Sequence, residues 1–361
     1  IDGFSQPGAS PNSLPIGSDA VVLVEVYGDL TVRGLRVTGA HNQIQGLAIF
    51  EIIGDGVRVV GRLAATNFVT GNWLGSDAAG VPHAGAGGSG VHIEKGATGT
   101  RVGGPSPAER NSIVGFARGI DHFNWGTNDS LIENNYIGLA PDGVTAFGNT
   151  IHGVDIQVNS RRVTIRGNVI SGNAKSGIEV SHGIVNSGHT IEQNLVGSDA
   201  AGMDVSLPYR NGQHGIHIED GIFDVVVRDN IVVNSRQVGI RLFLDVHDIA
   251  LEGNRVGVLS DGTPGPNGSG VEFSRGAFDN ILGPNNLVAY NDGHGVSVLP
   301  TDGPGGETSG NTISQNSIFS NGLDGIYVAT LPYFPPTITS PLAGEVSGTS
   351  ACSSCLLELF L

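Results

Sequence analysis

Residues 168–180 read Asn168-Val169-Ile170-Ser171-Gly172-Asn173-Ala174-Lys175-Ser176-Gly177-Ile178-Glu179-Val180, and they contain the two short elements that decide the fold. The first element is Asn, any residue, then Ile, Val or Leu. The second is Gly, a β-branched residue, a variable residue and usually an apolar one. Apolar residues at every second position predict a strand rather than a helix.

Both elements recur along the chain. The first begins at Asn72, Asn111, Asn135, Asn168, Asn194, Asn230, Asn254, Asn286 and Asn316. The second begins at Gly56, Gly90, Gly119, Gly153, Gly177, Gly215, Gly239, Gly270, Gly295 and Gly325. They alternate from Asn72 to Val328, and each pair takes 24 to 39 residues, which suits one coil of a solenoid. We therefore expect stacked coils around an aliphatic core, with the repeated Asn side chains bonded from coil to coil.

The Asn-x-Ile and Gly-Ile-x-Val elements resemble those of the right-handed parallel β-helix proteins, the pectate-lyase-like superfamily, of the bacterial secreted or cell-surface type. Residues 30–330 carry the resemblance. It implies an all-β fold, a right-handed parallel β-helix solenoid of about ten to eleven coils. The superfamily includes polysaccharide lyases, hydrolases, epimerases, phage tailspikes and bacterial surface proteins, so the resemblance leaves the function open.

The ends of the chain depart from the repeat. We expect residues 1–29 to cap the first coil and residues 331–345 to form a Pro-rich linker. Residues 346–361 resemble the start of a small β-sandwich module, which stops mid-strand, or else an assembly strand that pairs with a second copy. A disulfide between Cys352 and Cys355 is favoured over a redox Cys-x-x-Cys, because no βαβ pattern surrounds it.

Composition excludes two classes of partner. The chain has 361 residues, 34 acidic against 18 basic, and a formal net charge of −16. Without a basic excess it is a poor ligand for nucleic acid or for an anionic membrane surface. No apolar run approaches the roughly 18 residues of a membrane-spanning helix. The start at Ile1 with no leader predicts either a removed signal peptide or a fragment, and we expect a secreted or cell-surface location.

The corners alternate between long and short, so the true unit is a pair of coils of about 60 residues. Each long corner carries a related loop with one Asp, and the four loops are residues 75–80, 138–143, 197–202 and 257–262. One carboxylate per loop supplies few ligands for Ca²⁺, which is usually bound by several oxygens, although a calcium site stays open as the alternative. An Asx turn followed by Gly explains the same residues and is the favoured interpretation.

The variable residue of each Gly-Ile-x-Val strand should point outward and form one column on one face. In order, the column is Arg58, His92, Asp121, Asp155, Glu179, His217, Arg241, Glu272, Ser297 and Tyr327. Three carboxylates stand in consecutive coils, at Asp121, Asp155 and Glu179. Carboxylates this close should raise at least one pKa, which suits the acid and the base of glycoside cleavage. Alternatively they hold Ca²⁺ against an acidic sugar, with Arg241 or a histidine such as His217 taking the proton.

Other outward residues are candidates for contact with a sugar chain: His92, Glu219, Glu272, Phe123, Trp125 and Phe243. His122 follows Asp121 on the same strand and should therefore face inward, as a hydrogen-bonded core histidine. A solvated sheet face with mixed charges accounts for the same column without chemistry.

Two functions remain open. The favoured one is an extracellular or cell-surface rod with a structural or adhesive role and polysaccharide contact along the acidic face. The alternative is a polysaccharide lyase, epimerase or glycoside hydrolase that uses carboxylates on adjacent coils. Against the alternative, neither Lys95 nor Lys175 belongs to the column, and the Asp-Pro-His of the superfamily's epimerases is absent at Asp121.

Overall fold

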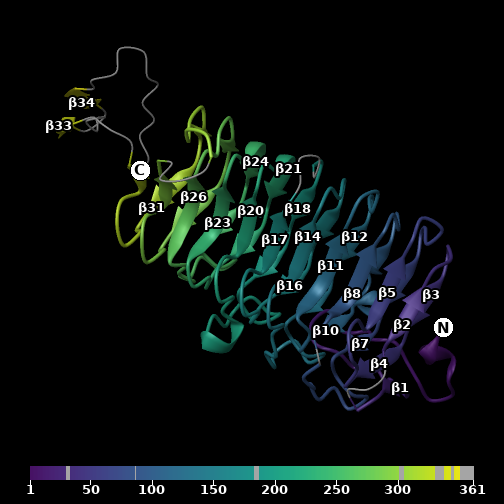
Figure 1. Cartoon of the computed structure of the whole chain (residues 1–361). Coiled ribbons are helices and arrows are strands. Elements are labelled where there is room, and N and C mark those ends of the chain that lie inside the picture. The colour runs from purple at the N-terminus through teal and green to yellow at the C-terminus, as the bar shows by residue number, and fades with distance from the viewer. Residues whose placement is uncertain are drawn as a thin grey trace.

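The computed structural model describes residues 1–29, 33–85, 87–182, 187–300, 305–329, 337–342 and 345–349. Its strands form three long parallel sheets that wind around one core as a parallel β-helix (Figure 1). Two sheets have eleven strands and the third has ten, which confirms the predicted all-β solenoid of about ten to eleven coils.

Each coil contributes one strand to each sheet. Sheet 1 contains β1 (Val24–Tyr27), β4 (Leu47–Phe50), β7 (Trp73–Leu74), β10 (Ser112–Ile113), β13 (Tyr136–Ile137), β16 (Val169–Ile170), β19 (Leu195–Val196), β22 (Ile231–Val232), β25 (Arg255–Val256), β28 (Leu287–Ala289) and β31 (Ser317–Phe319). Sheet 2 contains β2 (Leu35–Val37), β5 (Val57–Val60), β8 (Ser89–Glu94), β11 (Arg118–Phe123), β14 (Val154–Gln157), β17 (Ile178–Ser181), β20 (Ile216–Glu219), β23 (Val238–Phe243), β26 (Ser269–Ser274), β29 (Val296–Val298) and β32 (Ile326–Val328). Sheet 3 contains β3 (Gln43–Gln45), β6 (Phe68–Thr70), β9 (Arg101–Gly103), β12 (Leu131–Glu133), β15 (Thr164–Arg166), β18 (Thr190–Glu192), β21 (Phe223–Arg228), β24 (His247–Glu252), β27 (Ile281–Leu282) and β30 (Thr312–Ile313).

The described residues include three short 3-10 helices: η1 (Gly3–Ser5) before the first strand, and η2 (Pro107–Glu109) and η3 (Leu207–Tyr209) within the coils. No helix among the described residues is long and apolar enough to cross a membrane. Strand β1 falls within the segment predicted as a cap and already pairs in parallel with β4. The segment predicted as a linker includes β33 (Thr337–Leu342), which pairs antiparallel with β34 (Glu345–Thr349). The predicted domain boundaries remain predictions, and Cys352, Cys355 and residues 356–361 lie outside the described residues.

The first apolar residue of each Gly-Ile-x-Val strand points into the core. Successive examples in sheet 2 are in register, Ile120 with Val154, Val154 with Ile178 and Ile178 with Ile216, and all four are fully buried. They belong to one hydrophobic cluster that extends from Val37 to Ile318. Stacking thus buries an aliphatic column that no single coil could bury alone.

The predicted asparagine ladder is present in sheet 1. Each side-chain amide from Asn72 to Asn286 donates to the side-chain oxygen of the next repeated Asn, at 2.8 to 3.1 Å. The same amides also donate to backbone carbonyls, as Asn168 does to Ile132 at 3.0 Å. The ladder therefore satisfies buried corner groups and ties each coil to the next.

A second ladder was not predicted. It runs from Asn149 through Asn173 to Asn211 and resumes from Asn267 through Asn291 to Asn321. Its members follow five residues after a first-ladder Asn in several coils, as Asn173 follows Asn168. This spacing was the signal that could have revealed it.

The Asp residues of the four long corners form turns, as the favoured interpretation predicted. The carboxylate of Asp142 accepts the backbone N–H groups of Val144 and Thr145 at 2.9 and 2.8 Å. Asp77, Asp199 and Asp261 accept backbone N–H groups of their own loops in the same way. The first glycine of each loop has positive φ, and a Cβ on Gly138 would collide with the carbonyl oxygen of Ser171 in the next coil.

Candidate active site

The outward column exists as predicted on the outer face of sheet 2. Strand register places Arg58 beside His92, and the neighbours then follow one coil at a time to Ser297 and Tyr327. Asp121, Asp155 and Glu179 are consecutive partners in this series. Residues distant in sequence are therefore neighbours separated by one strand spacing, about 4.8 Å.

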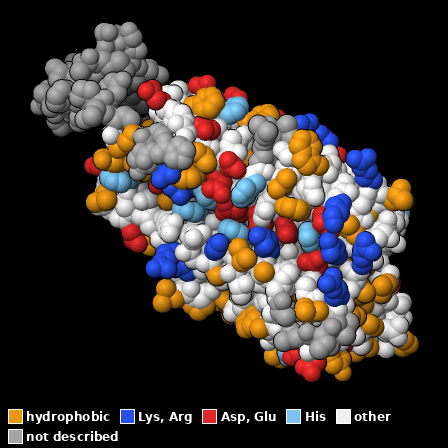
Figure 2. Space-filling view, in the orientation of Figure 1, with side chains coloured by type: hydrophobic (Ala, Val, Ile, Leu, Met, Phe, Trp, Pro, Cys, Tyr) orange, Lys and Arg blue, Asp and Glu red, His pale blue; other side chains and the backbone are white. Residues whose placement is uncertain are grey.

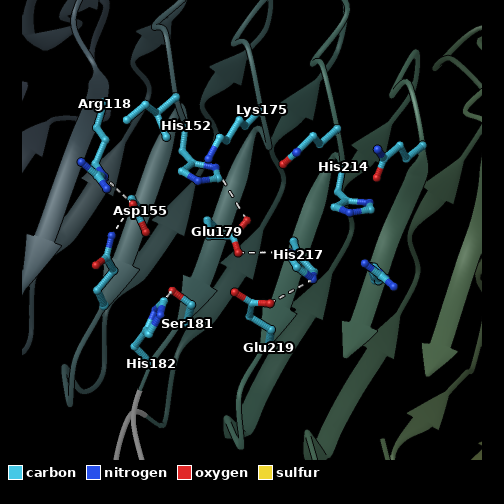
Figure 3. Close-up of a pocket in the computed structure, with 15 residues that line it drawn as sticks. Arg118, His152, Asp155, Lys175, Glu179, Ser181, His182, His214, His217 and Glu219 are labelled. Atoms are coloured by element: carbon cyan, nitrogen blue, oxygen red, sulfur yellow. Dashed lines mark hydrogen bonds and ion pairs between the residues drawn. The ribbon is translucent and has the colours of Figure 1, made fainter. Parts of the chain in front are cut away.

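A hollow of about 470 Å³ lies over the middle of this column (Figure 3). Acidic and histidine side chains gather there on the molecular surface (Figure 2). Of the predicted catalytic residues, four line the hollow, namely Asp155, Glu179, His217 and Arg241, whereas Asp121 does not. Of the predicted sugar-contact residues, only Glu219 lines it.

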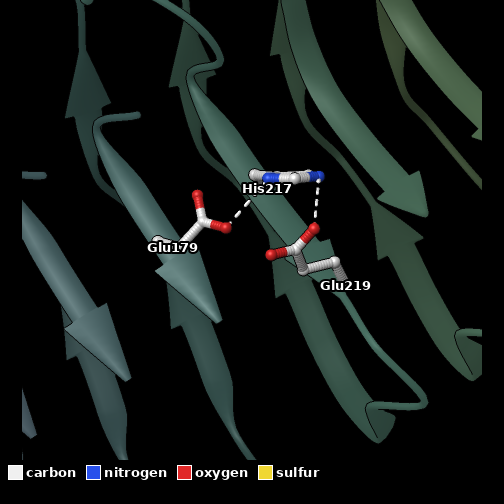
Figure 4. A group of neighbouring side chains, drawn as sticks. All are labelled: Glu179, His217 and Glu219. Carbon is white, nitrogen blue, oxygen red and sulfur yellow. Dashed lines mark ion pairs between the residues drawn. The ribbon is translucent and has the colours of Figure 1, made fainter. Parts of the chain in front are cut away.

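Glu179, His217 and Glu219 line the hollow and are neighbours on β17 and β20 (Figure 4). The Nδ1–H of His217 donates to Oε1 of Glu179 at 2.9 Å, across neighbouring coils. The other ring nitrogen, Nε2, has no hydrogen-bond partner among the described residues and lies 3.8 Å from Oε2 of Glu219. The carboxylate thus orients the imidazole and leaves Nε2 able to accept a proton.

The two carboxylates flanking His217 differ in their affinity for protons. Burial alone would raise the pKa of Glu179, but the hydrogen bond and charge of His217 lower it below the ordinary value. Burial raises the pKa of Glu219, and the charge of Glu179 raises it further against the opposing effect of His217. When the pKa values of two neighbouring carboxyl groups differ in this way, the group of lower pKa suits the role of anion and the group of higher pKa suits the role of proton donor. Here these are Glu179 and Glu219 respectively.

Three further histidines line the hollow and were not predicted, namely His152, His182 and His214. His152 lies with its Nδ1 3.6 Å from Oε2 of Glu179, and the ring of His214 packs on that of His217 with centroids 4.6 Å apart. Burial lowers the pKa of His152 and, together with the charge of His217, lowers that of His214 to about 3. His152 and His214 immediately precede the Gly of a Gly-Ile-x-Val element, and that position was the signal available in the sequence.

The carboxylate of Asp155 forms an ion pair with Arg118, and this pair, not the neighbouring carboxylates, determines its environment. Its side chain is 1% exposed, and Oδ2 lies 2.5 Å from Nε of Arg118 and also accepts the amide of Gln157. The pKa rise expected among the three acids occurs at Asp121, where burial raises the value to about 6, opposed by the charge of His92 and assisted by that of Asp155. Asp155 therefore has a structural ion partner, and its catalytic role remains a prediction.

The remaining candidates lie around the hollow. Nε of Arg241 bonds to Oε1 of Glu272 at 2.7 Å, and its guanidinium lies 4.1 Å from the ring centroid of Phe243. Phe123 lies farther along the sheet, with its ring 6.4 Å from that of His92, and Trp125 is 63% exposed in the turn that follows. Their predicted contact with sugar remains untested.

His122 faces the core, as predicted. It is fully buried, with Nδ1 2.9 Å from the hydroxyl oxygen of Ser160 and Nε2 3.0 Å from that of Ser130. Burial lowers the pKa of His122 to about 3, so the ring is neutral. His122 therefore stabilises the core and does not line the hollow.

Glu179, His217 and Glu219 are also the one group among the described residues whose potential metal-ligand atoms lie within 4.8 Å of one another. Two carboxylates and one imidazole do not resemble a Ca²⁺ site, which takes about six to eight oxygen ligands. The hydrogen bond that already occupies Nδ1 of His217 favours proton transfer as the use of this group. The possible Ca²⁺ dependence stays a prediction.

Structural comparison identifies the fold. The AlgE4 A-module, a mannuronan C-5 epimerase of Azotobacter vinelandii, aligns with a TM-score of 0.51 and 13% identity, over 93% of this chain and 98% of that chain. The Dettilon tailspike protein aligns with a TM-score of 0.49 and 17% identity, over 82% of this chain and 60% of the tailspike chain. PfbA, a surface adhesin of Streptococcus pneumoniae, aligns with a TM-score of 0.41 and 12% identity, over 81% and 80%.

No protein-family model matches the chain, and a search of the curated proteins found no relative. The similarity to the AlgE4 A-module, together with the three parallel sheets, confirms the predicted right-handed parallel β-helix. At this level of identity the similarity concerns the fold alone, so any activity has to be argued from the side chains.

Proposed function

We propose that this protein is a polysaccharide lyase that binds an acidic sugar chain along the outer face of sheet 2 and removes a proton from it with His217. The observation that carries the proposal is the unbonded Nε2 of His217 in the 470 Å³ hollow, with its Nδ1–H fixed by Glu179 and a second carboxylate 3.8 Å away. A buried, oriented imidazole can act as the general base, and a neighbouring carboxyl group of raised pKa can act as the general acid.

In the proposed reaction, Nε2 of His217 takes the proton from the sugar carbon next to the carboxylate group. The electron pair of that C–H bond forms a carbon–carbon double bond, and the bond to the glycosidic oxygen breaks. Glu219 gives its proton to the departing oxygen, and exchange with water then restores both groups. The charge of Glu179 stabilises the imidazolium while the proton is on His217.

Elimination is favoured over epimerisation by the placement of the two groups. His217 and Glu219 are on the same strand, β20, and both project from the same face of sheet 2. They therefore reach a bound sugar ring from one side, as removal of a proton and protonation of the leaving oxygen on that side require. Epimerisation would need a proton donor on the opposite side of the ring.

An acidic substrate fits the cations around the hollow. Lys175 lines it and forms no ion pair with another described residue. Arg118 and Arg241 also line it, although each is paired with a carboxylate. A substrate carboxylate beside these cations would have its charge partly neutralised, which makes the neighbouring C–H bond easier to break. A secreted or cell-surface location accompanies this proposal.

The proposal is tested by incubating the protein with alginate, pectate, chondroitin and neutral glucans. We expect ultraviolet absorbance from the new double bond with at least one acidic polymer and none with neutral ones. New reducing ends without that absorbance would contradict elimination and indicate hydrolysis. Binding without any product would contradict an enzyme and favour the structural or adhesive role considered from the sequence.

The proton on Glu219 gives the reaction a pH dependence. Because the pKa of Glu219 is raised, the carboxyl group keeps its proton to higher pH than an ordinary Glu, and turnover should fall as pH rises through that value. Glu219→Gln should lower turnover by about 10²-fold and remove this alkaline decline. The measurement is the initial rate of double-bond formation against pH for both proteins. An unchanged pH profile in the variant would assign the decline to another group.

A further inference from the structure

The strand that carries His217 has a second copy four strands away in the same sheet. Residues 215–219 read Gly-Ile-His-Ile-Glu, and residues 90–94 read Gly-Val-His-Ile-Glu. The sheet order between them is β8-β11-β14-β17-β20. Both copies also follow a long corner that contains the sequence Gly-Ser-Asp-Ala-Ala-Gly.

The contacts of the two histidines correspond closely. Nδ1 of His92 lies 3.1 Å from Oδ2 of Asp55 in the coil before it, as Nδ1 of His217 lies beside Glu179. Nε2 of His92 is buried without a hydrogen-bond partner among the described residues, 3.9 Å from Oε2 of Glu94 and 3.8 Å from Oδ2 of Asp121. His92 is therefore a second oriented imidazole with an unused nitrogen.

The charges around this second histidine differ from those around the first. Glu94 accepts two hydrogen bonds from Arg58 and also lies 3.5 Å from Nζ of Lys95. These contacts lower the pKa of Glu94 despite its burial, so it does not act as a proton donor as Glu219 does. The copy therefore has no proton donor at the position of Glu219, and the carboxyl of raised pKa near its histidine is Asp121, one coil farther along. The cations beside Glu94 favour binding of an acidic group over turnover as the use of this copy.

Arginines lie next to His92 along the sheet, together with the three carboxylates near its ring. A hollow of about 160 Å³ is lined by three arginines, Arg33, Arg36 and Arg58, and by the carboxylate of Asp55. Arg36, Arg58 and His92 are successive partners in the strand register of sheet 2. In Figure 2, Lys and Arg side chains gather over the N-terminal coils, beside the acidic and histidine-rich centre. Burial opposes protonation of His92, but Asp55 and Asp121 raise its pKa.

We propose that Arg36, Arg58 and His92 form a second binding site, which holds an acidic segment of the same polysaccharide chain that reaches His217. The inference rests on the proposed function. Four strand spacings of about 4.8 Å separate β8 from β20, so the two histidines lie about 19 Å apart along the sheet. A chain lying along the column contacts both sites once it is long enough to span this distance, and two linked contacts bind more tightly than one.

The test measures affinity against chain length by calorimetry, with size-fractionated oligosaccharides of alginate, pectate and chondroitin. His217→Asn serves as the parent protein so that no oligosaccharide is degraded. We expect affinity to rise by at least about tenfold when the oligosaccharide becomes long enough to span the two sites. Arg36→Gln and His92→Gln, each added to the parent, should remove this rise and leave the affinity for short oligosaccharides unchanged. Arg228→Gln, on sheet 3, is the matched control for lost charge and should preserve the rise.

The outcomes separate this inference from the function on which it depends. Binding of short and long oligosaccharides with equal affinity would overturn the second site alone. A rise that persists in both Arg36→Gln and His92→Gln would overturn it as well. If no acidic oligosaccharide binds the parent protein or the wild-type chain, the proposed function fails and the second site fails with it.

Discussion

Replacing His217 with Asn is expected to lower the rate of double-bond formation by about 10²–10⁴-fold, the usual contribution of a general base. The side chain of Asn cannot place a basic nitrogen where Nε2 of His217 lies, 3.8 Å from Glu219. The fold should persist, because the ring lies on the outer face of sheet 2 and its strand is held by Ile216 and Ile218 in the core. Initial rates and the thermal melting temperature are measured on the same preparation.

Two further variants make the result specific. Glu179→Gln should also slow turnover, because the imidazolium loses the charge that stabilises it. His247→Asn changes a histidine of β24 in sheet 3, where it stacks between Phe223 and Phe278, and it should leave the rate unchanged. Full activity of His217→Asn, or equal losses of rate in His217→Asn and His247→Asn, would show that His217 is not the catalytic base.

Replacing Asn168 with Leu is expected to cost about 3–5 kcal/mol of stability, from the middle of the ladder in sheet 1. The Asn168 amide donates to Ile132, Arg166 and Asn194, each at 3.0 Å. Its side-chain oxygen accepts both the backbone N–H and the side-chain amide of Asn135, each at 2.9 Å. Leu satisfies none of these buried groups, and each unpaired one costs about 1–3 kcal/mol, although the costs are not additive.

The loss should be local, because each coil contacts only its neighbours. Amide hydrogen exchange should therefore accelerate most in β13, β16 and β19 and least in coils far from them. Asn42→Leu is the matched control, since Asn42 is exposed and water can satisfy the groups that it leaves. Uniform acceleration along the whole chain, or an equal loss in the control, would contradict a ladder that acts coil by coil.

The fold was predictable because its determinants are short and repeated. Ile178 and Val180 occupy the inward positions of a four-residue pattern, and the same pattern returns in every coil. Once coils are stacked, strand register follows, so the pairing of Glu179 with His217 could be expected from the sequence. The alternation of long and short corners also predicted the four turns built on Asp residues.

The site was predictable only in outline. The pattern correctly predicted that Asp121, Asp155 and Glu179 are neighbours, and it suggested that they act as one group. In the structure Asp155 pairs with Arg118, and Glu179 pairs with His217. Arg118 starts β11, just before Gly119, where the chain leaves a corner of irregular conformation. Two-residue periodicity ends at such a corner, so the direction of a side chain there depends on contacts that the pattern does not contain.

Because every coil adds one strand to sheet 2, the distance from His92 to His217 can change only in whole strand spacings. A pair of coils inserted between β8 and β17 would move the histidines apart by about 10 Å, and each would keep the carboxylate in the coil before it. The number of coils between the two histidines therefore sets the length of polymer that the two proposed sites would span.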